Sequence, residues 1–147
     1  MPLAATEFEE YSPALSPDGR WLAYASDESR RSEVYVRPFP GAGTAKWQVS
    51  REGGTEPVWA HSGRELFYRN AAGDLVAADV APGPSFRVAS ERVLFPAREY
   101  VSDARDRNYT VSPDDRSFLF VRPQAGASSQ LVVVLNWFEE LKAKVGQ

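Results

Sequence analysis

A short motif recurs three times along the chain and constrains its fold more than any other feature of the sequence. The motif reads SPDGR at Ser16–Arg20, AHSGR at Ala60–Arg64 and SPDDR at Ser112–Arg116. Aligned on the closing arginine, the copies are 44 residues (20 to 64) and 52 residues (64 to 116) apart. Each copy joins a short strand-like segment to one that alternates aromatic and aliphatic residues. A period of about 40–50 residues built from short strands is typical of the four-stranded blades of a β-propeller.

The residues of the motif suit a tight hairpin turn. Proline presets φ near the value of a type I turn, aspartate accepts hydrogen bonds from the following backbone amides, and glycine accepts a positive φ. The middle copy keeps the glycine but loses the proline, and the last copy carries Asp115 at the glycine position, where aspartate is tolerated. We therefore assign structural turn roles to Pro17, Asp18, Gly19, Gly63, Pro113 and Asp114.

The remaining chain reads as antiparallel β structure until its last residues. Apolar runs of five to eight residues are bounded by Gly, Pro, Asn, Asp and Ser, the pattern of strands. In WFEELKAKV the apolar residues instead recur at helical spacing. The sequence predicts an all-β chain of three four-stranded blades, half of a six-bladed propeller, with a short C-terminal helix. The repeats span approximately residues 11–55, 56–106 and 107–147 of one domain.

Composition excludes several classes of partner and site. The net charge of −3 and the scattered basic residues argue against nucleic-acid binding. With no cysteine, the chain has no disulfide, no thiolate metal site and no thiol nucleophile. The N-terminus lacks the pattern of a leader, and the longest aliphatic run, Leu131–Leu135, is too short to span a bilayer. We expect a soluble protein that has no membrane contact and no cofactor.

No catalytic or metal-binding residue is assigned from the sequence. His61 is the only histidine and lies in a degenerate turn, so a hydrolytic scheme would have to use it with Ser62. No GxSxG nucleophile motif is present. The acidic run Asp103–Asn108 lacks the alternating ligands and the glycine of a calcium loop, which favours a solvated loop with internal arginine pairs.

At these turns the chain resembles the TolB-type, WD-repeat-like β-propeller family. Three longer segments resemble the C-terminal propeller region of bacterial serine/threonine protein kinases: SPDGRWLAYASDESRRSEVYVRPFP, WQVSREGGTEPVWAHSGRELFYRN and QLVVVLNWFEELKAKV. The resemblance extends from about Thr6 to Val145. None of the hallmarks of the kinase domain itself is present, so phosphoryl transfer is excluded for this chain alone.

The resemblance implies where a ligand would bind. In the family the innermost strand of each blade lines a central channel, and alignment places Ser12, Glu56 and Asn108 at equivalent positions that open this strand. The loops 27–32, 51–56 and 103–108 would share the same rim. They contribute the further candidate binding residues Arg30, Arg31, Arg51, Asp103 and Asp106.

The favoured function is a non-catalytic propeller module for protein or small-ligand recognition, in keeping with the sensor-like domains that it resembles. Because propellers close with four to eight blades, we expect two copies to pair into one ring. A compact sandwich, a domain-swapped form and a fragment of a longer chain are the alternatives to pairing. The alternative function is a hydrolase-related module, either a peptidase-type gating propeller or a weak esterase or peptidase that uses Ser62 and His61. If the chain is expressed as given, we expect it in the cytoplasm. If it is part of a membrane-anchored kinase, we expect it outside the cytoplasm.

Overall fold

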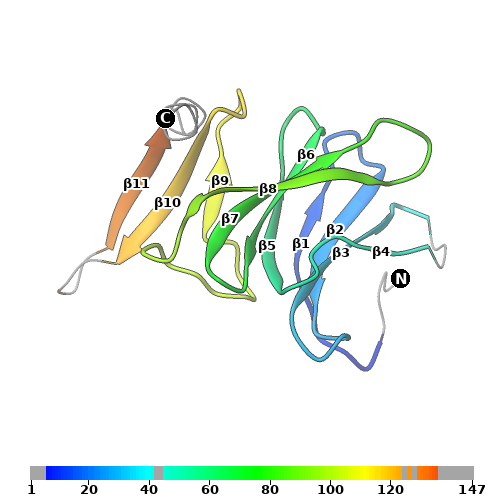
Figure 1. Cartoon of the computed structure of the whole chain (residues 1–147), viewed down its shortest axis with the longest axis horizontal. Helices are drawn as coiled ribbons and strands as arrows, with labels where there is room; N and C mark the ends of the chain where they lie inside the picture. The colour runs from blue at the N-terminus through cyan, green and yellow to red at the C-terminus, as the bar shows by residue number, and fades with distance from the viewer. Residues whose placement is uncertain (1–5, 42–44, 124–125, 127–128, 136–147) are drawn as a thin grey trace.

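Three antiparallel sheets follow one another along the chain in the computed structural model (Figure 1). The structure describes residues 6–41, 45–123, 126 and 129–135. The first sheet contains β1 (Glu10–Leu15), β2 (Trp21–Ser26), β3 (Glu33–Pro38) and β4 (Trp47–Gln48). The second contains β5 (Gly54–Trp59), β6 (Glu65–Asn70), β7 (Asp74–Val80) and β8 (Val88–Pro96). The third contains β9 (Tyr109–Val111), β10 (Ser117–Pro123) and β11 (Ser129–Leu135).

The predicted all-β blade architecture is confirmed. Each sheet is an up-and-down arrangement in which strands adjacent in sequence are also adjacent in space. The third sheet has three strands in the described residues, where four were predicted. The predicted helix at WFEELKAKV lies outside the described residues. In the part of the chain that the structure covers, no helix is long and apolar enough to cross a membrane.

The first SPDG turn is held by its own residues. The Gly19 N–H donates to the Ser16 carbonyl at 2.8 Å, and Gly19 has a φ of 71°, which glycine adopts without steric cost. The Asp18 carboxylate accepts from the Ser16 hydroxyl at 2.6 Å and from the Arg20 N–H at 3.1 Å. The Ser16 hydroxyl in turn accepts from the Trp21 N–H at 2.9 Å. Every bond joins residues within 16–21, so local sequence alone specifies this hairpin.

The third copy repeats this geometry. The Asp114 carboxylate accepts from the Ser112 hydroxyl at 2.5 Å and from the Arg116 N–H at 3.1 Å. The Ser117 N–H donates to the Ser112 hydroxyl at 3.0 Å. Asp115 takes the glycine position with a φ of 60°, as its tolerance for this region predicts.

Two apolar cores lie between the sheets. Residues of β2 and β3 pack against Trp59, Leu66 and Val76 of the second sheet, and the Trp59 indole N–H donates to the Ala14 carbonyl at 3.0 Å. The opposite face of the second sheet packs against the third, with the Phe67 and Phe118 rings edge to face at a centroid separation of 4.9 Å. The second sheet is therefore covered on both faces, as expected for a propeller blade between two neighbours.

Candidate functional site

The three predicted channel-mouth residues are tied into hydrogen bonds between sheets. Ser12 and Glu56 occupy bulges in β1 and β5 and have positive φ values of 51° and 53°. The Ser12 hydroxyl donates to the Ala104 carbonyl at 3.1 Å. Asn108, just before β9, donates to the Glu56 carboxylate through its backbone N–H at 3.0 Å and its Nδ2 at 3.1 Å. Glu56 and Asn108 therefore meet, whereas Ser12 contacts the connection between the second and third sheets.

Arg69 of β6 completes this network, although the sequence pattern did not identify it. Its Nε lies 3.6 Å from Glu56 Oε2, and the two side chains are 3% and 0% exposed. Its Nη atoms donate to the carbonyls of Ala97 at 2.6 Å and Val101 at 2.8 Å. Buried charges are tolerated when they are paired and hydrogen-bonded. The pair therefore fixes the segment 97–108 against the second sheet, and its only sequence signal was an arginine in the apolar strand ELFYRN.

Two of the predicted rim loops are joined by Arg31. Its Nε donates to the buried carboxylate of Glu33 at 2.5 Å, and its Nη2 donates to the Arg51 carbonyl. The same carboxylate accepts from the Gly53 N–H at 3.0 and 3.1 Å. Arg30 is exposed in the first of these loops and has a φ of 73°. Arg51 is also exposed and lines two hollows of about 510 and 350 Å³.

The third rim loop has hydrogen bonds of its own in addition to those that Ala104 and Asn108 make with Ser12 and Glu56. Asp103 accepts from the Arg105 N–H at 2.9 Å through its carboxylate and from the Asp106 N–H at 3.2 Å through its carbonyl. The Asp106 carbonyl accepts from Asn108 Nδ2 at 2.9 Å. Among the described residues no three His, Asp or Glu side chains are grouped so as to hold a metal ion. Both aspartates are exposed at the surface of this loop.

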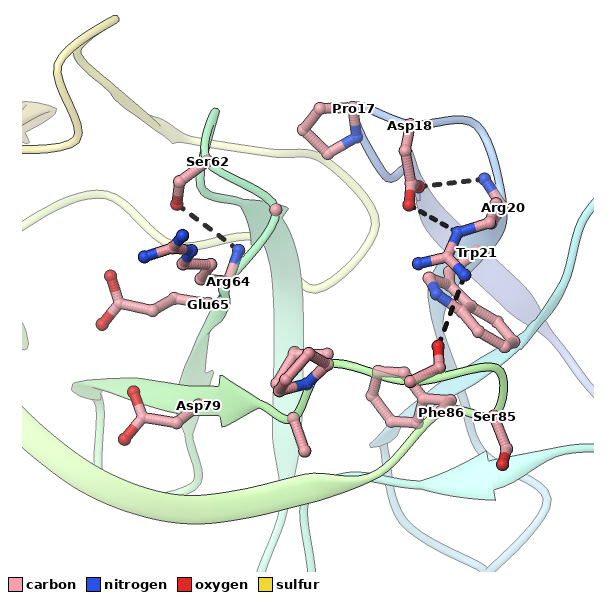
Figure 2. A pocket seen from close by; sticks show the side chains of 15 residues that line it. Pro17, Asp18, Arg20, Trp21, Ser62, Arg64, Glu65, Asp79, Ser85 and Phe86 are labelled. Atoms are coloured by element: carbon pink, nitrogen blue, oxygen red, sulfur yellow. Dashed lines mark hydrogen bonds and ion pairs between the residues drawn. The ribbon is translucent and has the colours of Figure 1, made fainter.

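A groove of about 820 Å³ lies between the turns of the first two sheets (Figure 2). The β1–β2 turn, residues 17–21, forms one wall, and residues 62–65 of the β5–β6 turn form the other. The end of β7 and the following loop, residues 79–86, lie beneath them. The groove thus places two copies of the repeated turn opposite each other, at the end of the blades where the first hairpin of each sheet turns.

Aromatic rings and one ion pair line the side of the groove nearest the first sheet, where Phe86 of the loop after β7 meets Trp21 of β2. Trp21 and Phe86 lie edge to face with centroids 5.8 Å apart. The Arg20 guanidinium lies 5.6 Å from the Trp21 ring centroid and its Nε is 2.7 Å from the Asp18 carboxylate. Arg20 Nη1 also donates to the Gly83 carbonyl at 3.4 Å. The Arg20 guanidinium is therefore already paired with residues of the groove.

The other side of the groove leaves one cation available. Its two acidic residues share one cation, Arg92, which donates to Asp79 at 2.6 Å and also pairs with Glu65. Burial acts to raise the pKa of Asp79, but its bonds to Ser90 and Arg92 hold that pKa below its ordinary value. Arg64 is exposed, and its guanidinium makes no hydrogen bond or ion pair with any residue that the structure describes. Arg20, Arg64 and Arg92 together balance Asp18, Glu65 and Asp79, so Arg64 offers an available guanidinium in a groove that has no net charge.

His61 and Ser62 are held by a residue of the next sheet. The backbone N–H groups of His61 and Ser62 donate to the Asp115 carboxylate at 2.7 and 2.9 Å, and His61 Nδ1 lies 3.1 Å from the same carboxylate. Burial acts to raise the pKa of Asp115, but these bonds lower it. The Ser62 hydroxyl accepts from the Arg64 N–H at 3.4 Å. No hydrogen bond joins the Ser62 hydroxyl to the His61 ring among residues 6–41, 45–123, 126 and 129–135.

Comparisons with known proteins agree with this architecture. No family model matches the chain. A segment of 31 residues, 21% of the chain, is 61% identical to the Tol-Pal system protein TolB of Thioalkalivibrio sulfidiphilus and covers 7% of that protein. Among solved structures, TolB from Acinetobacter baumannii matches 91% of the chain at 13% identity with a TM-score of 0.50.

Two further solved structures are similar over most of the chain. An oligogalacturonate lyase from Vibrio parahaemolyticus matches 90% of the chain at 15% identity with a TM-score of 0.61. A TolB-like protein of Agrobacterium tumefaciens matches 92% at 13% identity with a TM-score of 0.59. The chain spans 43%, 40% and 48% of the lengths of these three structures. The likeness establishes a TolB-type propeller fold. The chain is somewhat less than half as long as each of these relatives.

Proposed function

We propose that the chain is a non-catalytic β-propeller module that recognises a protein or small ligand through the groove between its first two sheets. The observation that carries this proposal is the exposed Arg64 guanidinium across the groove from an apolar wall that contains Trp21 and Phe86. Binding sites commonly combine apolar walls with a few polar groups that orient the ligand. A guanidinium pairs with carboxylates in a planar, bidentate geometry. The chemistry of the groove therefore favours a ligand that carries a carboxylate.

The structural relatives suggest which carboxylates to test. One similar structure, 14% identical with a TM-score of 0.59, is an oligogalacturonate lyase in complex with manganese. Oligogalacturonates are chains of sugar acids, so they present carboxylates at regular intervals. The donor set here does not match a manganese centre, because the chain has a single histidine and the described residues contain no metal-binding group. The comparison therefore suggests sugar acids as one class of carboxylate ligand to test at the groove.

A titration with matched variants tests the groove. The probes are short oligogalacturonates and an aspartate-rich peptide, followed by calorimetry. We expect Arg64→Gln to weaken binding about tenfold, since one charge-assisted contact contributes about 1.5 kcal/mol. Arg107→Gln, which removes an exposed arginine of the 103–108 loop, serves as the control and is expected to leave affinity unchanged. Loss of binding in Arg51→Gln with retention in Arg64→Gln would place the site at the predicted rim instead.

A second candidate function, a weak esterase or peptidase, is favoured by one contact. The His61 ring is paired with Asp115 at 3.1 Å, as a general base is paired with the group that orients it. Turnover of ester and peptide substrates that is abolished in His61→Ala and in Ser62→Ala would establish this function. Persistent absence of turnover in the native chain would leave recognition as the function.

The larger assembly is also part of the proposal. The resemblance to kinase-associated propellers supports a sensor-like role beside a kinase domain. The described residues form three sheets, which is fewer than the four to eight blades of a closed ring. We therefore propose a second copy of the chain as the partner that completes it.

A further inference from the structure

Three of the most exposed large aliphatic side chains lie on the outermost sheets. Leu131 and Val133 of β11 are 73% and 53% exposed, and Leu15 of β1 is 47% exposed. The first and third sheets stand at opposite ends of the array (Figure 1). Isolated exposed apolar residues are common, so the position of each of these residues within its sheet decides what the exposure means.

The two residues of β11 occupy positions that are buried in the other sheets. Leu131 pairs with Val121, Val34 pairs with Ala25, and Leu75 pairs with Arg69. The partners Ala25, Arg69 and Val121 each lie five residues after the closing arginine of their turn, so they are equivalent in the three sheets. Leu131 therefore corresponds to Val34 and Leu75, which are both 0% exposed.

The same register applies to Val133. Val133 pairs with Leu119, which is equivalent to Ala23 and Phe67. Ala23 pairs with Val36 and Phe67 pairs with Ala77, so Val36 and Ala77 are the residues equivalent to Val133. Both of these residues are 0% exposed because a following sheet covers them. The face of the third sheet that carries Leu131 and Val133, which we call the trailing face, is thus a blade-to-blade surface against which no other described sheet packs.

Leu15 defines the complementary surface at the other end. It lies five residues before Arg20, as Trp59 and Val111 lie five residues before Arg64 and Arg116. Trp59 is 6% exposed and Val111 is 4% exposed, because each packs against the preceding sheet. The face of the first sheet that carries Leu15 and Leu22, the leading face, likewise has no other sheet packed on it in the part of the chain that the structure describes.

From these equivalences we infer that the trailing face of one copy packs against the leading face of a second copy. This inference rests on the pairing proposed above and identifies the surfaces that carry it. The chain contains both halves of the missing interface, and they continue the two interfaces already formed inside it. A twofold axis applies the contact twice and leaves no apolar face uncovered. At this interface Leu119 of one copy takes the place of Phe67, and Leu22 of the other copy takes the place of Phe118, which are in ring contact inside the chain.

Absolute mass from light scattering after size exclusion, over a concentration series, tests the inference. The native chain is expected at twice the 16.3 kDa chain mass. We expect Val133→Asp to raise the dissociation constant about 30-fold or more, as for a central interface residue. Val93→Asp is the matched control, because Val93 is 50% exposed on β8 and lies outside both faces. A monomeric native chain, or equal effects of the two variants, would overturn the inference.

Cross-linking resolves the direction of the contact. The chain has no cysteine, so single-cysteine variants Leu22→Cys and Leu119→Cys can be mixed and treated with a short bismaleimide. A covalent dimer is expected in the mixture and not in either variant alone. Cross-linking of Leu119→Cys with itself would show like faces in contact and would overturn the inference. Ligand binding at the groove is measured separately, because that groove lies within one copy, so failure of either proposal is distinguishable.

Discussion

The turns of the first and second sheets follow the same backbone path but are stabilised by different residues. In residues 16–20 the Ser16 hydroxyl and the Asp18 carboxylate accept the hydrogen bonds of the turn. In residues 60–64 an alanine replaces the serine, and the backbone N–H groups of His61 and Ser62 donate to Asp115 of the next sheet. Gly19 and Gly63 have nearly equal φ values of 71° and 69°.

The difference shows how a degenerate repeat can keep its geometry. A turn that has lost the serine and aspartate acceptors of the first copy, and keeps only a long bond to the Ser62 hydroxyl, is stabilised by a neighbouring blade, and the same bonds join the two blades. The acceptor is available because Asp115 occupies the glycine position of its own turn with a φ of 60°. The second turn therefore depends on tertiary structure in a way that the first does not.

Among the substitutions that test the difference between the two turns, Asp115→Ala is expected to lower stability the most. The substitution leaves two backbone N–H groups without their charged acceptor and lowers the free energy of unfolding by about 2 kcal/mol. Urea denaturation measures the change. Asp106→Ala, an exposed aspartate of the 103–108 loop, is the control and should change stability by less than about 0.5 kcal/mol. Equal effects of the two variants would show that the turn does not depend on the third sheet.

A rebuilt second turn should remove this dependence. Ala60→Ser and Ser62→Asp together restore the acceptors that the first turn has, and Asp115→Gly then removes the competing carboxylate. We expect the triple variant to recover about 1 kcal/mol of the stability lost in Asp115→Gly alone. Denaturation of the two variants side by side measures the recovery. No recovery would mean that Ser16 and Asp18 do not account for the independence of the first turn.

Substitution of the two glycines should affect both turns equally. A Cβ at Gly19 meets no atom within 4 Å and one at Gly63 meets only Pro17 Cδ at 3.9 Å, so the positive φ is the only strain. Gly19→Ala and Gly63→Ala are each expected to cost about 1 kcal/mol. Thermal denaturation of both variants tests the equality. A markedly larger cost at one position would show that the two backbones are not equivalent.

Acidification should weaken both turns, with a smaller effect. Hydrogen bonds from the Ser16 hydroxyl and from Arg20 lower the pKa of Asp18 to about 2 from its ordinary 3.8. The stabilisation is present above pH 3.8 and is lost as the pH falls through about 2. Because Asp18 is half-exposed, its contribution is about 1 kcal/mol or less after screening.

The measurement for this effect is the free energy of unfolding of the native chain and of Asp18→Asn between pH 2 and pH 7. The difference between them should be constant above about pH 4 and should decrease at lower pH. Asp115→Asn should behave with the same sign, since the pKa of Asp115 is also lowered. A difference that grows on acidification would contradict the assignment of Asp18 as an ionised acceptor.

The candidate site was predictable only in part. The alignment of the repeats gave Ser12 and Glu56 equivalent positions, and the structure adds that both lie at bulges with positive φ. It gave no sign that Arg69 pairs with Glu56 or that Glu56 is wholly buried. From the sequence, an arginine in an apolar strand is interpreted as a surface residue. In the structure it is buried because the segment 97–108 provides the carbonyls that it binds.

The sequence by itself determined the three repeats, the strands and the hairpin chemistry, because these depend on residues a few positions apart. Only the tertiary structure decided that Asp115 holds the second turn and that Arg64 faces a groove. It also decided that Leu15, Leu131 and Val133 are left uncovered. The His61–Asp115 contact joins residues 54 positions apart. Contacts of this kind form only after whole blades have packed together, and no local pattern of residues encodes which side chains then meet.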